Sequence, residues 1–239
     1  MRFEHSHTPE AIAARLAHGP RTSYLRDWVY GGIDGAVTTF AIVAGAVGAS
    51  LDARVVLILG CANLIADGFS MAAGNFSGTR ADIADYRRLR RMEERHIRTD
   101  PAGEAEEIRQ IFAQKWFDGA DLEEITGLIT QRREVWVDTM LAEEHGRSNV
   151  LASPLKAAGA TFAAFVVCGA APLVPFVLGL ANAAAIATAA TAAVFFAIGS
   201  TKSVWSTESW WRSGAETLAV GLLAAAVAYL IGDVLASIV

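Results

Sequence analysis

Cysteine is scarce in this chain, which has only two among its 239 residues. Both Cys61 and Cys168 fall inside apolar runs, which excludes a disulfide framework and a CxxC metal motif. The chain also lacks a basic patch with interleaved aromatic residues, so we expect no nucleic-acid partner. Residues 1–20 contain no apolar core, and we therefore expect no signal peptide in them.

Charge is nearly absent from two long apolar runs. Residues 28–51 contain only Asp34, and residues 55–79 contain only Asp67. Each run is long enough to cross a bilayer as a helix, which takes about 20 residues. A carboxylate near the centre of the bilayer costs roughly 2.5–3.5 kcal/mol, so intramembrane acids usually have a function. The two acids therefore indicate a polar route between the helices.

The second run carries four candidate groups, Asp67 among them, at a spacing of four residues, which places them along one stripe of a helix. They are Asn63, Asp67, Met71 and Asn75. Oxygen and thioether donors together suit a divalent transition metal of intermediate softness. In the alternative interpretation, the amides form hydrogen bonds between helices and Met71 fills a gap in the packing. We predict that this stripe and Asp34 form a transport path.

Three more apolar stretches follow residue 153, over about 157–178, 179–200 and 214–237. The sequence thus predicts an all-α, polytopic membrane protein with five transmembrane helices. Every lysine and arginine except Arg54 lies before the first span, between residues 80 and 156, or between spans four and five. The positive-inside rule then places the N-terminus and the middle of the chain in the cytosol and the C-terminus outside. The predicted domains are a cytosolic N-terminal segment (1–26), spans one and two (27–79), a cytosolic helical domain (80–152) and spans three to five (153–239).

The middle of the chain is predicted to be helical. The second span continues without a helix breaker to about residue 98. Three helices follow, over about 101–114, from Asp118 or Asp121 to about 131, and over about 132–146. Asp100 and Pro101 have the residue types of an N-cap and a first helical position, and Gly146 is expected to end the last helix.

Acidic residues on these helices are spaced so that pairs share one face. The candidate metal ligands are Glu93, His96, Glu104, Glu107, Met140, Glu143 and Glu144. A carboxylate-rich cluster with an imidazole suits Fe(II), Mn(II) or Zn(II). The alternative is a set of solvated helix faces, on which the neighbouring arginines neutralise the acids.

Three segments resemble signatures of the vacuolar iron transporter family. YGGIDGAVTTFAIVAG (30–45) resembles the first-span signature, ANLIADGFSMAAGNF (62–76) resembles the second, and PLVPF (172–176) fits the third span. The similarity covers nearly the whole chain from about residue 22. It implies five spans, a homodimer and a three-helix cytosolic metal-binding domain. It also implies movement of Fe(II), and often Mn(II), out of the cytosol in exchange for protons.

The resemblance assigns roles to individual residues. Asp34 matches the family's first-span acid and Met71 its second-span thioether, whereas Asn63 stands where plant members have a glutamate. Asp67, one turn further on, is the candidate to replace that acid. In the cytosolic domain the matching ligands are Glu93, Glu104, Glu107, Met140 and Glu144. His96 stands where the family has a glutamate, and Glu143 is a candidate to compensate.

Our hypothesis is proton-coupled transport of Fe(II) out of the cytosol, with Mn(II), Zn(II) or Co(II) as alternative substrates and no organic cofactor. The expected partners are metal ions, protons, membrane lipid and a second copy of the chain. Usage of Ala, Gly and Arg favours the bacterial cytoplasmic membrane.

Two other functions are open to the same sequence. A membrane-tethered, ferritin-like protein would bind or oxidise iron, because Glu93-x-x-His96 resembles half of a di-iron carboxylate site. Such sites need two of these motifs and only one is present, so we predict that the protein is not an enzyme. A passive metal sensor or sink would leave Asp34 and Asp67 without a purpose.

Overall fold

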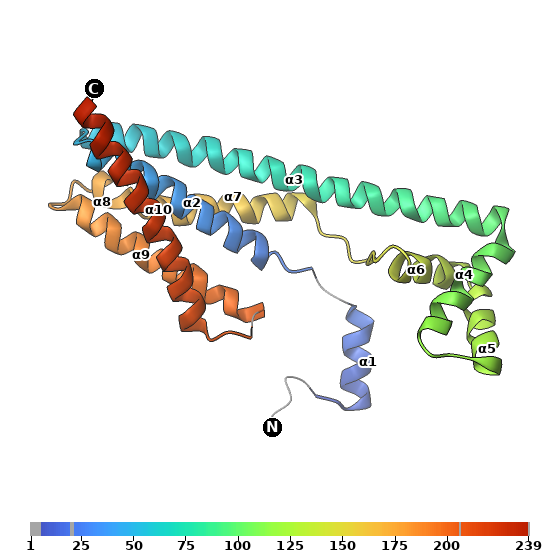
Figure 1. Cartoon of the computed structure of the whole chain (residues 1–239). Helices are drawn as coiled ribbons and strands as arrows, with labels where there is room; N and C mark the ends of the chain where they lie inside the picture. The colour runs from blue at the N-terminus through green and yellow to red at the C-terminus, as the bar shows by residue number, and fades with distance from the viewer. Residues whose placement is uncertain (1–5, 20–21, 206, 239) are drawn as a thin grey trace. The chain divides into compact units, whose positions relative to one another are not determined.

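The computed structural model describes residues 6–19, 22–205 and 207–238, so residues 1–5, 20 and 21 of the predicted N-terminal segment lie outside it. The described residues form α-helices and one 3-10 helix, without a strand (Figure 1). The chain divides into two compact units. The membrane unit comprises Ser23–Gly78 and Ser153–Val239, and the polar domain comprises Met1–Thr22 and Thr79–Ala152.

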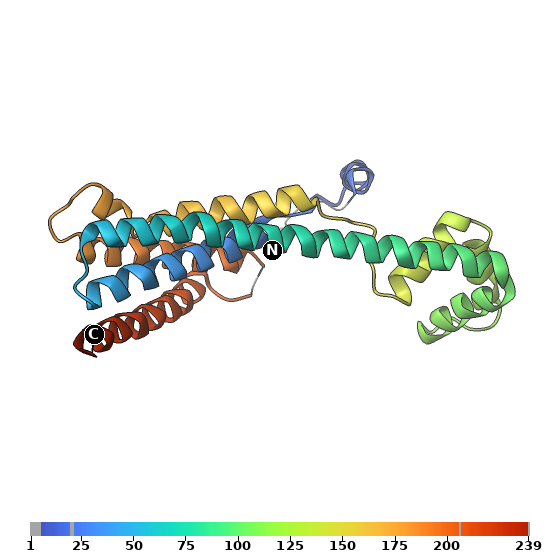
Figure 2. The same cartoon turned by 90° about the horizontal axis from the view of Figure 1, so that it is seen from above.

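The membrane unit is built from apolar helices. They are α2 (Leu25–Gly48), the first part of α3 (Ala53–Thr99), α7 (Pro154–Ala170), the short α8 (Val174–Val177), α9 (Ala183–Thr201), the 3-10 helix η1 (Lys202–Trp205) and α10 (Trp210–Ile238). In both views α2, α7, α9 and α10 lie side by side, and α2 packs against each of the other three (Figure 2).

Four of the described helices, α2, α3, α9 with η1, and α10, are long and apolar enough to cross a membrane. This confirms the prediction of an all-α polytopic membrane protein. The fifth apolar helix, α7, has 17 residues, so a count of five spans stays a prediction. It ends at Ala170, inside the apolar stretch that continues to residue 178, because Pro172 and Pro175 lack the N–H groups that would continue it.

Glycine on α2 permits its close packing against α7. A Cβ atom at Gly31 would lie 2.3 Å from the carbonyl oxygen of Thr161, and one at Gly35 would lie 2.3 Å from that of Phe165. No side chain fits at either position, so the two backbones approach as closely as glycine allows. This contact fixes the face of α2 that Asp34 borders.

The polar domain contains α1 (Pro9–His18), residues 79–99 of α3, α4 (Pro101–Gln114), α5 (Gly119–Thr130) and α6 (Arg133–Glu143). In both views α4, α5 and α6 gather beside the C-terminal end of α3 (Figure 1, Figure 2). The predicted cap is confirmed, because the Asp100 carboxylate accepts a hydrogen bond from the Gly103 N–H at 3.0 Å.

Two small apolar cores hold these helices together. Tyr86 and Leu89 of α3 pack against Val137 and Leu141 of α6. The second core joins α4, α5 and α6 through Ile108, Ile129, Trp136 and Met140. Helix α6 is shorter than the predicted 132–146 and ends at Glu143. The chain turns there, because Gly146 adopts a φ of 61° and the Arg147 N–H donates to the Leu141 carbonyl at 2.8 Å.

Candidate functional site

Two glutamates are buried in the polar domain without enough partners. Glu93 of α3 is 1% exposed and Glu104 of α4 is 5% exposed. The Oε2 atom of each is buried and has no hydrogen-bond partner among the described residues. Nearly all buried polar atoms in proteins are hydrogen-bonded, and an unpaired buried charge is costly. These two oxygen atoms therefore point to a cation that binds between the helices.

Glu93 is shared by two groups of candidate ligands. Glu93, His96 and Glu104 form one group, and Glu93, Glu144 and His145 form the other. Within each group the ligand atoms all lie within 4.8 Å of one another. The Nε2 atom of His145 lies 2.9 Å from Glu93 Oε1, and the Nδ1 atom of His96 lies 3.4 Å from Glu104 Oε1. Three elements, α3, α4 and the end of α6, thus supply oxygen and nitrogen donors to one cluster.

Mutual repulsion and burial make this cluster favour a positive charge. Burial, with the neighbouring carboxylates Glu107 and Glu93, raises the pKa of Glu104 to about 7. Burial also raises the pKa of Glu144; His145 opposes that rise and Glu93 adds to it. A divalent cation bound among these carboxylates would relieve their mutual repulsion. Without a bound cation, protonation of a carboxylate relieves it.

We expect the metal-free polar domain to lose stability as pH rises from about 5 to about 8. Because the pKa of Glu104 is about 7 in the folded state and 4.5 ordinarily, the folded state binds more protons in this range. Stability therefore falls with rising pH, by up to roughly 3 kcal/mol from this one group. Hydrogen exchange of the α4–α6 amides in chelator-treated full-length protein, corrected for the intrinsic pH effect, measures this fall. In the Glu104→Gln variant, the stability of the domain should depend less on pH. A wild-type domain whose stability does not fall between about pH 5 and about pH 8 would contradict the prediction.

The structure brings most, but not all, of the predicted ligands together. Glu93, His96, Glu104 and Glu144 belong to the two groups, and Glu107 is close enough to raise the pKa of Glu104. Glu143 forms an ion pair with Lys115 instead. Met140 is fully buried in the apolar core of α4–α6. The metal-binding role of all these residues stays a prediction.

His145 is the cluster member that sequence reasoning missed. It directly follows Glu144, so its position beside a predicted ligand was the available signal. In a helix that continued to residue 146, the side chains of Glu144 and His145 would point about 100° apart, so the two would not be expected to share a site. Because α6 ends at Glu143, His145 lies in the turn and reaches Glu93.

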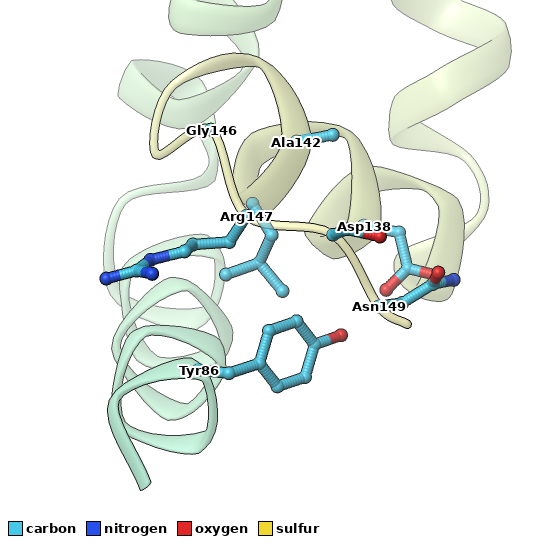
Figure 3. A pocket seen from close by; sticks show the side chains of 8 residues that line it. Tyr86, Asp138, Ala142, Gly146, Arg147 and Asn149 are labelled. Carbon is cyan, nitrogen blue, oxygen red and sulfur yellow. The ribbon is translucent and has the colours of Figure 1, made fainter. Parts of the chain in front are cut away.

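Ion pairs hold α6 against α3 beside the cluster. Arg90 of α3 donates to Asp138 at 2.8 Å and also pairs with Glu134, both of α6. After the helix, Arg147 pairs with Asp85 at 2.6 Å. A cavity of about 360 Å³ lies beside this seam. Figure 3 shows the residues that line it, with the Tyr86 ring across from α6 and the segment that follows it. None of the candidate ligands lines that cavity.

In the membrane unit, the predicted path residues face the packed side of their helices. Asp34 of α2 is half-buried, as are Asn63, Asp67, Met71 and Asn75 of α3. Between them on α3, Leu64 and Gly68 are buried, whereas Ala66 and Ser70 are exposed. Neither Asp34 nor Asp67 has a basic side chain within ion-pair distance in the part of the chain that the structure describes. Both acids are therefore partly covered by the protein and lack permanent cationic partners among the described residues.

Polar side chains connect this stripe to the neighbouring helices. The Asn63 amide donates to Thr38 Oγ1 at 3.4 Å, and the Thr38 hydroxyl donates to the Asp34 carbonyl at 2.9 Å. The Asn75 amide donates to Asp27 Oδ1 at 2.8 Å and contacts Thr161 Oγ1 at 2.7 Å. Asn75 therefore also forms the interhelical hydrogen bonds of the alternative interpretation, and its transport role stays a prediction. Sequence reasoning missed Asp27, whose only signal was its place in the first turn of the first span.

Comparison with known proteins matches this chain to one family. The family model described as "VIT family" matches residues 25–233. The chain is 27% identical over 215 residues to vacuolar iron transporter 1 of Arabidopsis thaliana, a match that covers 88% of this chain and 85% of the relative. It is 30% identical over 212 residues to vacuolar iron transporter 2 of Oryza sativa subsp. japonica, covering 86% and 85%. A vacuolar iron transporter of Toxoplasma gondii is 33% identical over 159 residues, which cover 65% of this chain and 53% of that protein.

The family model spans α2 to α10 almost completely, including the polar domain between the membrane helices. The resemblance that the first-span and second-span segments predicted is thereby confirmed. This chain belongs to the VIT family.

Proposed function

We propose that this protein moves Fe(II) out of the cytosol across a membrane in exchange for protons. Metal-ion transport itself follows from the family, whose relatives carry the name vacuolar iron transporter. The observation that carries the finer proposal is the pair of half-buried acids, Asp34 and Asp67, which have no basic partner in the described membrane unit. An intramembrane carboxylate without a fixed counter-ion suits a site that a cation and a proton occupy in turn.

In this proposal the polar domain collects the ion and the membrane unit carries it across the membrane. Glu93, Glu104, Glu107 and Glu144, with His96, would collect the ion in the polar domain and raise its local concentration. Asp34, Asp67 and Met71 would bind the ion in the membrane unit through two carboxylates and a thioether, with Asn63 beside them. Protonation of a carboxylate removes the charge that holds the metal, so a proton arriving from the far side would release it. In this proposal the polar domain lies in the cytosol, and the proton comes from the other side of the membrane. A second copy of the chain would complete the transport path.

Flux measurements in liposomes test this proposal. Purified protein is reconstituted with an iron-sensitive dye inside, Fe(II) is added outside under reducing conditions, and the lumen is made acidic. We expect Fe(II) entry together with alkalinisation of the lumen, and loss of net entry when a protonophore removes the gradient. Entry that is indifferent to the pH gradient would contradict the coupling, and absence of entry would contradict the transport of iron.

One observation favours the alternative of an iron-oxidising domain. The structure adds a second imidazole, that of His145, to the cluster that contains Glu93 and His96. Two imidazoles with bridging carboxylates are the ingredients of a di-iron site, although only one Glu-x-x-His motif lies on a helix here. Oxygen consumption on addition of Fe(II) distinguishes the two functions, because a transporter without oxidase activity consumes none above the protein-free rate.

A further inference from the structure

The segment after α6 holds an imidazole against the most buried acid of the polar domain. Two features of the turn fix the position of His145. They are the positive φ of Gly146 and the hydrogen bond from the Arg147 N–H to the Leu141 carbonyl. Arg147 is in turn tied to Asp85 of α3 by an ion pair at 2.6 Å. The position of the imidazole is therefore set by the fold on both sides of it.

We infer that His145 is a metal ligand, and that His145 and His96 together make this domain select Zn(II), Co(II) and Fe(II) over Mn(II). The inference rests on the proposed metal-collecting role of the domain and names its preferred substrates. Each group of three candidate ligands contains Glu93 and one imidazole, that of His96 in the first group and that of His145 in the second.

A role for His145 as a counter-ion alone does not account for the geometry. Its Nε2 atom contacts Glu93 Oε1 at 2.9 Å and lies 3.6 Å from Glu144 Oε2. The other oxygen of Glu93, Oε2, is buried and has no partner among the described residues, and Glu104 Oε2 is in the same condition. An imidazolium would satisfy one oxygen and leave these two unsatisfied. A cation bound by the imidazole nitrogen and the carboxylates satisfies them together.

The donor set decides which cations bind well. Carboxylates alone suit hard ions such as Mg(II), Ca(II) and Mn(II), whereas imidazole suits Zn(II), Fe(II) and the later divalent ions. Affinity at a given set of N and O ligands rises from Mn(II) through Fe(II) to Co(II), and Zn(II) also binds above Mn(II). Two imidazoles in a carboxylate cluster increase the differences in affinity between these metals. Loss of one imidazole should therefore weaken the binding of Zn(II) and Co(II) more than the binding of Mn(II).

Binding affinities of the full-length protein in detergent test the inference, with Zn(II), Co(II) and Mn(II) each measured by competition with a metal-binding dye. The variants are His145→Ala and His145→Gln. The glutamine amide can still donate a hydrogen bond to Glu93, but it is a poor ligand for these metals. We expect both variants to lose about 10- to 100-fold in affinity for Zn(II) and Co(II), and clearly less for Mn(II). His18→Ala, which removes an exposed histidine of α1, is the matched control and should change none of the three affinities.

Three outcomes would overturn the inference. They are unchanged affinities, an equal loss for all three metals, or a His145→Gln variant that binds like wild type, which would make His145 a hydrogen-bond partner only. Thermal melting of the metal-free variants shows whether the domain is still folded. Because the readout is binding, its failure is separable from that of the proposed function: wild-type protein that transports Fe(II) while His145→Gln keeps its selectivity would overturn this inference alone.

Discussion

Replacing Asp34 with asparagine is expected to reduce Fe(II) flux in liposomes by at least about 100-fold. Metal binding to the polar domain should stay unchanged. Asparagine keeps the size and the hydrogen-bonding capacity of the side chain but removes its charge. Asp34 is half-buried on α2, on the helix whose glycine face is packed directly against α7. Because the substitution adds no volume, the helix packing should survive, and the loss would report the missing charge.

Two comparisons make this result specific. Asp233→Asn is the matched control, since Asp233 also lies on an apolar helix, α10, but is exposed. It should transport at the wild-type rate. Asp67→Asn should reduce flux as Asp34→Asn does, because Asp67 is also half-buried and has no basic partner among the described residues. Normal flux through Asp34→Asn would remove the basis of the proposed path.

The periodicity of the sequence was sufficient to predict which side of α3 is polar. A spacing of four residues placed Asn63, Asp67, Met71 and Asn75 on one stripe, and the structure finds all four half-buried. The long extension of α3 and the Asp100 cap also follow from local rules, because helix propensity and capping depend on neighbours in sequence. Apolar content alone was enough to predict the four helices that are long enough to cross a membrane.

Contacts between residues distant in sequence could not be predicted in this way. His145 reaches Glu93 across 52 positions only because α6 ends early and the chain turns back. The pairing of Glu143 with Lys115 and the burial of Met140 depend on how α4, α5 and α6 pack, which helical periodicity does not specify. The predicted end of α6 differs from the structure by about three residues, which is within the usual uncertainty of helix termini.

Glu93→Gln is expected to have the largest effect on the polar domain, because Glu93 is the one residue that both groups of candidate ligands share. Its removal should weaken metal binding at both groups together, by at least about 100-fold. The metal-free domain, by contrast, should not be destabilised by the loss of charge. Glu93 is 1% exposed and its charge helps to raise the pKa of Glu104, so a neutral amide relieves repulsion there.

Thermal melting with and without metal measures both halves of this expectation. A ligand at about 100 times its Kd stabilises the folded state by roughly 2.7 kcal/mol, so wild-type protein should melt at a higher temperature when Zn(II) or Co(II) is added. Glu93→Gln should melt at or above the wild-type temperature without metal and should gain nothing from it. Glu143→Gln is the matched control, because Glu143 pairs with Lys115 outside both groups, and it should respond to metal as wild type does. A Glu93→Gln variant that metal still stabilises would show that the buried carboxylate, despite its unpaired oxygen, does not hold the ion.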